Sequence, residues 1–263
     1  MNKIEICKKI KNVTRKILLK DGDNYISAGT GILINSEGFI LTANHVIEKY
    51  KQLKQPLIIV NTFDNDGSLQ PIPYTIDFSD VSLDVGTSGV VKPLGIDLAI
   101  LRPIENLEGL EFMELEESIP DVGEDVIMAG FPDEINPTLD FNKSLNYEGN
   151  AELVAKHKEI ENHFKFSMNL IMAKSGMIGA VHGIKISAKF LDKSVSIDGA
   201  SYWIDNASTF GASGGPVVNY SGKLVGIVCQ KGLTSLNGIE KIIPSGTTMA
   251  LSHKLITWKI SKQ

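Results

Sequence analysis

The sequence contains little cysteine and no excess of basic residues. Cys7 and Cys229 are the only cysteines among 263 residues. A secreted domain of this size more often has several disulfide bonds, so we expect two free thiols in a reducing compartment. Acidic residues outnumber basic ones, 31 against 26, and the net charge is −5. Because nothing offsets the charge of a phosphate backbone, we expect no nucleic-acid partner.

Long apolar runs are also missing. The chain is polar and charged from Asn2 onward and has no apolar segment of the kind found in secretory signals. No run of 18 apolar residues marks a membrane span. We therefore expect a cytoplasmic protein without a membrane partner. The lysine-rich stretch KKIKNVTRKILLK at 8–20 is interleaved with apolar residues, and we interpret it as the solvated face of a helix or strand.

The sequence does contain a series of short strand patterns. Residues 29–47, GTGILINSEGFILTANHVI, alternate apolar and polar side chains around Ser36-Glu37-Gly38, which predicts a β-hairpin. Further short strands are predicted in QPLIIVNTF, IDLAILRP, EDVIMAGFP, GMIGAVHGIKIS, PVVNYSGKLVGIVC and TTMALS. Many short strands at roughly even spacing predict a sandwich or a barrel.

Helical patterns are scarce. Residues 151–162 place four side chains on one helical face, Leu153, Val154, His157 and Ile160. A short helix is also predicted near the carboxyl end, in LSHKLITWKISK, with Ser252 as its N-cap. We interpret 132–150, which is rich in Asn, Asp and Pro, as an exposed loop.

Three polar residues stand out from their apolar or small neighbours. Ser213 lies within TFGASGGPVV, His45 ends a predicted hairpin strand in LTANHVI, and Asp97 precedes a predicted buried strand in GIDLAIL. A serine hydroxyl is a weak nucleophile unless a base takes its proton, and that base needs an orienting carboxylate. Each residue alone has an ordinary structural explanation, but the three types together match this requirement.

Together, these segments resemble the trypsin-like serine proteases of the chymotrypsin fold, nearest the HtrA/Deg branch. GTGILINSEGFILTANHV is similar to the family's glycine-rich strand, hairpin and histidine, IDLAILR to its Asp-Leu-Ala segment, and GASGGPVVN to its Gly-x-Ser-Gly-Gly-Pro loop. VGEDVIMAGFP resembles the strand after the interdomain link. The resemblance covers about 25–132 and 174–250, with the motifs in the family's order. HtrA relatives usually carry a following PDZ domain, which we do not expect in a chain that ends at Gln263.

The resemblance implies a role for each matching residue. His45 becomes the general base and then the general acid, Asp97 orients its imidazole, and Ser213 becomes the acylated nucleophile. The backbone N–H groups of Gly211 and Ser213 become the oxyanion hole. No cofactor is implied. A metal site at His157 and His163 is not expected either, because their spacing lacks the H-E-x-x-H pattern.

The segment GASGG also fits G-x-S-x-G, the nucleophile elbow of α/β-hydrolases. Those enzymes place the acid and then the histidine after the serine. Here no aspartate follows Ser213, and the strands lack the alternating helices of a parallel sheet. We therefore reject this alternative.

Two alanines depart from the pattern of the digestive relatives. Ala212 takes the place of an aspartate that pairs with a newly cut amino terminus, so activation of that kind is not expected. Ala207, six residues before the serine, takes the base position of the primary specificity pocket. Without a counter-charge there, we expect cleavage after a small or medium apolar residue. The full set of expected substrate-binding residues is Ala207, Ser208, Phe210, Cys229, Gln230, Lys231 and Thr248.

We therefore predict an all-β protein of two antiparallel β-barrels, a chymotrypsin-like double barrel with a small helical insertion and a short carboxyl-terminal helix. The amino-terminal lobe, 1–115, carries His45 and Asp97. The carboxyl-terminal lobe, 116–263, carries Ser213 and an insertion at about 133–162. We expect this insertion to be a surface addition or, alternatively, a lid or partner-docking element beside the cleft.

The predicted function is that of a serine endopeptidase acting on peptide or protein substrates. One alternative is a protease-fold binding module, inactive until a regulatory partner or a homo-oligomer orders the oxyanion loop. Another is an esterase on the same scaffold.

Overall fold

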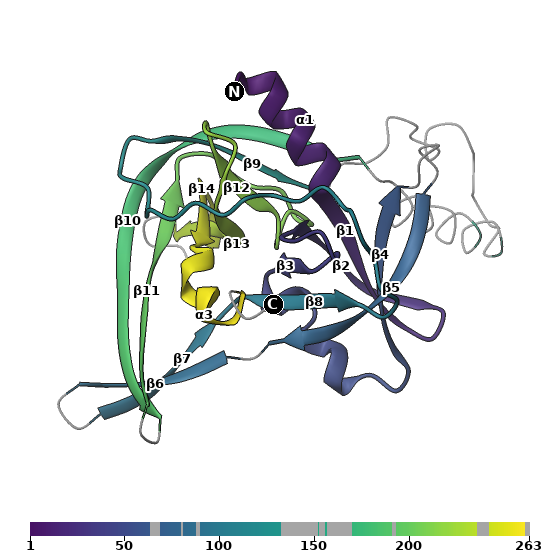
Figure 1. Ribbon diagram of the computed structural model, residues 1–263, viewed down its shortest axis with the longest axis horizontal. Coiled ribbons are helices and arrows are strands. Elements are labelled where there is room, and N and C mark those ends of the chain that lie inside the picture. Colours follow the sequence, from purple (N-terminus) through teal and green to yellow (C-terminus); the bar gives the residue numbers. More distant parts are fainter. Residues whose placement is uncertain are drawn as a thin grey trace.

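The computed structural model of the protein is built mainly from β-strands (Figure 1). It describes residues 1–63, 69–79, 81–87, 90–132, 152, 156, 170–190, 193–235 and 242–260. In chain order the elements are α1 (Lys3–Val13), β1 (Thr14–Asp21), β2 (Asn24–Leu33), β3 (Ile40–Thr42), η1 (Asn44–Val46), η2 (Glu48–Gln52), β4 (Pro56–Phe63), β5 (Leu69–Phe78), β6 (Val81–Thr87), β7 (Val90–Ile96), β8 (Ala99–Pro103), β9 (Asp125–Gly130), β10 (Met172–Phe190), β11 (Lys193–Ile204), β12 (Pro216–Asn219), β13 (Leu224–Ser235), β14 (Ile242–Leu251), η4 (His253–Ile256) and α3 (Thr257–Ile260).

The strands close into two antiparallel barrels. The first has the order β1-β2-β3-β8-β5-β4, and the second has the order β10-β11-β14-β13-β12-β9. Strands β6 and β7 pair with each other in a separate two-stranded sheet, which projects at the lower left of Figure 1. The predicted chymotrypsin-like double barrel is therefore confirmed.

The hairpin predicted around Ser36-Glu37-Gly38 is confirmed as β2 and β3. Gly31 pairs with Thr42 and Leu33 with Ile40, and the Asn35 side chain accepts a hydrogen bond of 2.9 Å from the Phe39 N–H. Ile32, Leu33, Ile40 and Leu41 are buried. His45 follows three residues after the end of this hairpin at Thr42.

The lysine-rich stretch at 8–20 divides between a helix and a strand. Helix α1 begins with a capping box, in which the Asn2 side chain accepts from the Glu5 N–H at 3.0 Å and Glu5 accepts from the Asn2 N–H at 2.9 Å. Ile6, Ile10 and Val13 lie on one face and are buried. The helix ends at β-branched Val13, and Thr14 already has extended backbone angles. The segment therefore has a buried apolar face as well as the expected solvated one.

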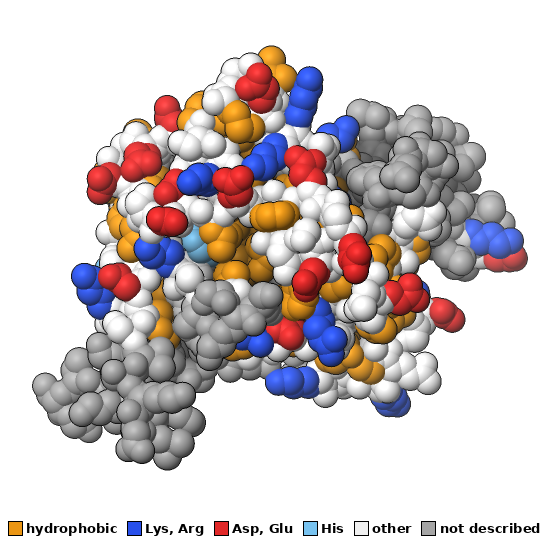
Figure 2. Space-filling model, in the orientation of Figure 1, with side chains coloured by type: hydrophobic (Ala, Val, Ile, Leu, Met, Phe, Trp, Pro, Cys, Tyr) orange, Lys and Arg blue, Asp and Glu red, His pale blue; other side chains and the backbone are white. Residues whose placement is uncertain are grey.

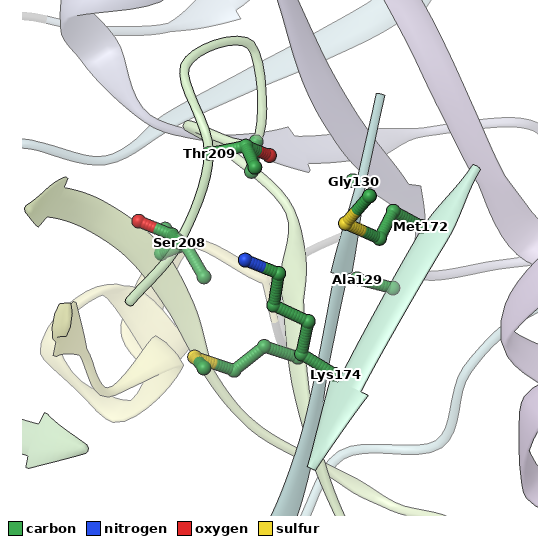
Figure 3. A pocket seen from close by; sticks show the side chains of 9 residues that line it. Ala129, Gly130, Met172, Lys174, Ser208 and Thr209 are labelled. Carbon is green, nitrogen blue, oxygen red and sulfur yellow. The ribbon is translucent and has the colours of Figure 1, made fainter. Parts of the chain in front are cut away.

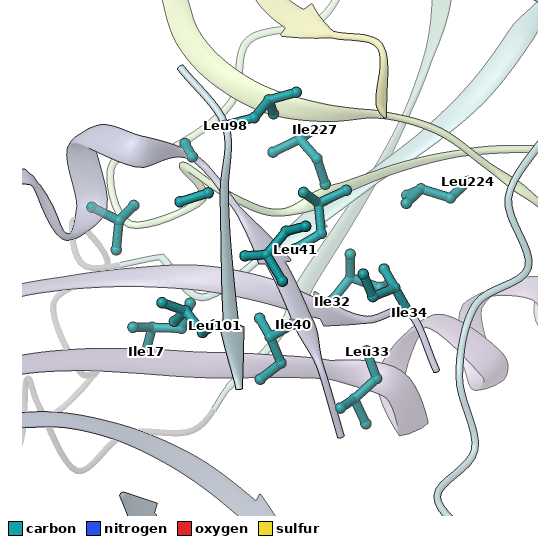
Figure 4. Close-up of a cluster of buried hydrophobic side chains, with 14 of the residues drawn as sticks. Ile17, Ile32, Leu33, Ile34, Ile40, Leu41, Leu98, Leu101, Leu224 and Ile227 are labelled. Atoms are coloured by element: carbon teal, nitrogen blue, oxygen red, sulfur yellow. The ribbon is translucent and has the colours of Figure 1, made fainter. Parts of the chain in front are cut away.

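A single apolar cluster runs from α1 through the first barrel into the second. It includes Ile6 of α1, Leu41 and Leu98 of the first barrel, and Leu224 and Ile227 of β13. Figure 4 shows Leu98 close to Ile227, at the place where the two barrels meet. A smaller cluster fills the rest of the second barrel, around Val126, Ile178, Tyr202, Val217 and Ala250. The two barrels are therefore joined by buried apolar contact.

The carboxyl end forms the predicted short helical segment. Ser252 caps η4 by accepting from the Lys254 N–H at 3.2 Å, and α3 follows directly. The predicted helix at 151–162, the insertion at 133–162, His157 and His163 lie outside the described residues, apart from Glu152 and Lys156.

Acidic and basic side chains are interspersed over the face shown in Figure 2. Within the described part of the chain, no helix has the length and apolar character needed to span a membrane. The same residues hold no group of three or more His, Cys, Asp or Glu that fits a metal ion.

Candidate active site

His45 and Asp97 meet because β3 and β8 are neighbours. Thr42 at the end of β3 pairs with Ala99 at the start of β8, so the residues just beyond these ends lie together. One Asp97 carboxylate oxygen accepts from the His45 backbone N–H at 2.8 Å, and the other lies 2.8 Å from His45 Nδ1. The carboxylate therefore fixes both the backbone and the ring of the same histidine.

This contact also sets the protonation of the ring. The hydrogen bond with Asp97 raises the pKa of His45 above its usual 6.5, against the effect of partial burial, and the negative charges of Asp97 and Glu48 act in the same direction as the hydrogen bond. An ionised carboxylate only accepts, so Nδ1 carries the proton of the neutral ring. The neutral tautomer then has its lone pair on Nε2.

Ser213 lies in a loop between β11 and β12, residues 205–215, which we call the serine loop. The loop contains two consecutive tight turns, and Ser213 lies in the second: the Ala212 N–H donates to the Thr209 carbonyl at 3.2 Å, and the Gly215 N–H donates to the Ala212 carbonyl at 2.9 Å. Gly211 has φ +81° and Gly214 has φ +83°, conformations that a Cβ disfavours. Among the residues that the structure describes, the N–H groups of Gly211 and Ser213 have no protein acceptor.

The serine loop is docked on the first barrel through Thr30 of β2. The Thr30 N–H donates to the Ser213 carbonyl at 2.8 Å, and its hydroxyl donates to the Gly211 carbonyl at 2.7 Å. Gly214 lies so close to this barrel that an added Cβ would stand 2.0 Å from the Thr30 carbonyl oxygen and 3.1 Å from the Ala43 nitrogen. Ala43 precedes His45 by two residues, so the structure brings the loops of Ser213 and His45 together.

Cys229 makes a second connection between the barrels. Its side chain is 4% exposed, and its Sγ lies 3.5 Å from the Asp97 carbonyl oxygen. Burial raises the pKa of this thiol well above its usual range. Cys229 and Cys7 are both free thiols. Of the expected substrate-binding residues, Cys229 therefore has only its backbone available to face a substrate.

The other expected pocket residues lie around the serine loop. Thr248 of β14 is buried, and its hydroxyl accepts from the Ser208 N–H at 2.6 Å and donates to the Asn206 carbonyl at 2.6 Å. Thr248 thus holds the loop at residues 206 and 208. Ser208 is itself buried.

Two pocket residues form an exposed contact at the edge of the loop. Phe210 is 61% exposed, and the Lys231 ammonium nitrogen lies 3.4 Å from the centre of its ring. Lys231 of β13 pairs with Thr248 of β14, and its neighbour Gln230 is exposed. The Ala207 carbonyl accepts a hydrogen bond of 2.8 Å from Lys174.

Sequence reasoning missed Thr30 and Lys174. Thr30 belongs to the quoted glycine-rich strand, and a hydroxyl in that otherwise apolar run was the available signal. Lys174 precedes an expected strand, and no spacing in the sequence links it to Ala207.

The chain belongs to the trypsin-like peptidase family. The family's trypsin-like peptidase domain matches residues 29–227, a range that contains His45, Asp97 and Ser213.

Solved structures with a similar fold include two states of one mycobacterial protease. The inactive form of Rv3671c protease from M. tuberculosis has a TM-score of 0.55 and 17% identity, over 98% of this chain and 92% of that one. The active form has a TM-score of 0.53 and 16% identity, over 98% and 83%. Deg5 has a TM-score of 0.54 and 18% identity, over 86% and 83%. At these identities the likeness concerns the fold alone. No curated protein matches the sequence.

Proposed function

We propose that the protein is a serine endopeptidase near the HtrA/Deg branch, which cleaves peptide bonds through an acyl-enzyme. The observation that carries this proposal is the paired contact of Asp97 with His45, at 2.8 Å to the backbone N–H and 2.8 Å to Nδ1. Such a pair holds an imidazole ready to accept a proton. It lies in the barrel on which the loop of Ser213 is docked.

The proposed reaction follows from these contacts. Nε2 of the neutral His45 ring takes the hydroxyl proton as Ser213 Oγ bonds to the substrate carbonyl carbon, and the carbonyl π electrons move onto the oxygen. The N–H groups of Gly211 and Ser213 donate to that oxyanion. His45 then gives its proton to the departing amine as the C–N bond breaks. Water repeats the sequence on the ester and releases the acid.

The surroundings of the loop disfavour a basic residue on the acyl side of the scissile bond. Ala207 supplies no counter-charge, and Ser208 and Thr248 are buried neutral residues. The substrate is expected to add to β13 as an extended strand, passing the exposed Gln230 and the Phe210–Lys231 contact. We therefore propose cleavage after small or medium apolar residues.

Labelling with a fluorophosphonate probe tests the nucleophile. Wild-type protein is expected to take up one probe at Ser213, and Ser213→Ala to take up none. Ser221→Ala is the matched control, because Ser221 is an exposed turn residue. Absence of label on the wild-type protein, alone and with candidate partners present, would refute the endopeptidase proposal. Labelling only with a partner would favour the alternative of a regulated binding module.

Mapping of new amino termini in a proteome, with wild-type against Ser213→Ala protein, tests the specificity. Enrichment of small or medium apolar residues before the cut is expected. A strong preference for Lys or Arg would show that the reading of Ala207 is wrong. Turnover of ester substrates without any peptide cleavage would identify an esterase instead.

A further inference from the structure

The serine loop has no ion pair at residue 212, where the digestive relatives it resembles have an aspartate. Ala212 is 6% exposed, and it packs closely on β9: a Cβ added to Gly130 would stand 2.6 Å from the Ala212 Cα. There is no room at this contact for a side chain on Gly130. A charged side chain does contact the backbone of the loop, five residues before Ala212: Lys174 binds the Ala207 carbonyl.

Lys174 reaches the loop from β10. It pairs with Met128 of β9 in the sheet, and its half-buried side chain crosses the space between these strands and the serine loop (Figure 3). Its ammonium donates to the Ala207 carbonyl at 2.8 Å. Among the described residues, no carboxylate lies within 4.0 Å of this ammonium. The ammonium therefore binds the Ala207 carbonyl and no carboxylate among these residues, and its bond to the carbonyl is a charge-assisted hydrogen bond.

The pocket around Lys174 is nearly filled. It is lined by β9, β10, β13 and the serine loop, with Met128, Gly130, Met172, Thr209, Ala212 and Val228 among its residues. The remaining cavity is about 10 Å³, close to the smallest space that holds one water molecule.

Lys174 acts on the loop just before its turns. Thr248 holds the neighbouring residues 206 and 208, and Thr30 holds the carbonyl of Gly211 at the far end. The Ala207 carbonyl lies between these supports, two residues before the Thr209–Ala212 turn. Its orientation sets how the chain enters the turn that carries the Gly211 N–H.

We propose that Lys174 is a positioning residue that holds the serine loop in its reactive conformation through the Ala207 carbonyl. The proposal rests on the proposed peptidase function for its kinetic consequences, but not for the loop conformation itself. The ammonium is supplied from within the chain, so the loop is ordered by β10 rather than by a new amino terminus.

The kinetic test compares three variants. Lys174→Met keeps a long apolar side chain but removes the donor, Lys174→Arg keeps a charged donor, and Lys185→Met removes an exposed lysine from the same strand. We expect kcat/KM and the fluorophosphonate labelling rate to fall roughly 30-fold in Lys174→Met, as for loss of a charged hydrogen bond. The fall should be mainly in kcat, because the oxyanion donors act in the transition state. Lys174→Arg should recover at least a third of the rate, and Lys185→Met should match wild type.

Chemical rescue separates positioning from a general packing defect. In Lys174→Ala, added propylammonium is expected to raise the labelling rate at least fivefold, because it fits the vacated space and donates N–H groups. Tetramethylammonium has no N–H and should have no effect. Equal labelling by wild type and Lys174→Met would overturn the proposal, and so would a Lys174→Ala protein rescued equally by both ions.

Amide hydrogen exchange of residues 207–213 tests the loop without reference to catalysis. Exchange should be faster in Lys174→Met than in wild type and Lys185→Met, with the rest of β10 unchanged. If wild-type protein never labels, the peptidase proposal fails and exchange alone decides the role of Lys174. Unchanged exchange would then refute it. If wild type labels normally and exchange is unaltered in the variant, only the positioning role is lost.

Discussion

The two barrels hold their candidate catalytic residues in different ways. In the first barrel, His45 and Asp97 bind each other, whereas in the second barrel the loop of Ser213 is held by residues from several other strands. Asp97 binds both the backbone and the ring of His45, and the paired strands β3 and β8 bring the two residues together. The carbonyl groups of the serine loop instead accept hydrogen bonds from Thr30 of the other barrel, from Lys174 of β10 and from Thr248 of β14. The first half of the site is therefore local, and the second half depends on correct packing of both barrels.

The largest loss of activity is expected from a substitution of Asp97, in the His45–Asp97 half of the site. Asp97→Asn keeps the size of the side chain but removes the carboxylate that selects the Nδ1–H tautomer, so we expect kcat/KM to fall about 10,000-fold. The raised pKa of His45 should also fall. Since the base must be neutral, the acid limb of the pH profile of kcat/KM should move from above pH 6.5 to a lower pH. An unmoved limb would contradict the assignment of His45 as the base.

The second-largest effect is expected at Gly214, where the serine loop packs against the first barrel. Gly214→Ala puts a Cβ 2.0 Å from the Thr30 carbonyl oxygen at a position with positive φ, so we expect kcat/KM to fall about 100-fold or more. The matched control is Gly246→Ala, which has a similar φ of +83° but nothing within 4 Å. This control should cost about 1 kcal/mol of unfolding free energy and little activity. Equal loss of activity in both variants would attribute the effect to backbone strain rather than to docking.

A smaller effect is expected at the Thr30 hydroxyl. It donates to the Gly211 carbonyl at 2.7 Å and accepts from the Phe131 N–H at 3.0 Å, and Thr30 is fully buried. Thr30→Val should lower kcat/KM about tenfold and the unfolding free energy by about 2 kcal/mol. Thr14→Val is the control, because the buried Thr14 hydroxyl has no partner among the described residues. It should leave both quantities within error of wild type, as measured by denaturant unfolding and peptide hydrolysis.

The smallest effect on activity concerns a histidine away from the site. Burial lowers the pKa of His253 to about 4, the opposite direction to His45. Below pH 6.5 the unfolded chain binds a proton there that the folded chain does not bind until about pH 4. Stability is therefore lost as the pH falls, by about 2 kcal/mol at pH 5. His253→Gln should remove this part of the pH dependence of urea unfolding while kcat/KM at pH 7.5 stays within twofold. An identical pH dependence in both proteins would rule out His253 as its source.

The sequence predicted well the features that depend on local pattern. The alternation around Ser36-Glu37-Gly38 predicted the hairpin that leads to His45. The order of the motifs along the chain predicted the double barrel. Each of these signals lies within a few neighbouring residues, or in a resemblance to known proteins.

Features that depend on contacts between distant residues were not predicted. The Lys174 contact with Ala207 spans 33 positions and the Thr30 contact with Gly211 spans 181, and no periodicity records either of them. The stretch at 8–20 was interpreted as a helix or a strand, and the extent of α1 was not predicted, because the apolar face of this helix has only three buried positions amid many lysines. The contact of the Cys229 side chain with Asp97, which spans 132 positions, was not predicted either. The assignment of the pocket residues, Cys229 included, stays a prediction.

The continuous apolar cluster should limit how far one barrel opens while the other stays folded. Because α1 and both barrels share the cluster, opening either barrel exposes apolar surface of the other, and we expect a single cooperative unfolding transition. A folded molecule then rarely presents one loosened barrel to its neighbours. Endopeptidases cut extended, unfolded chain most readily, so this joint core would make the folded protein a poor substrate for itself.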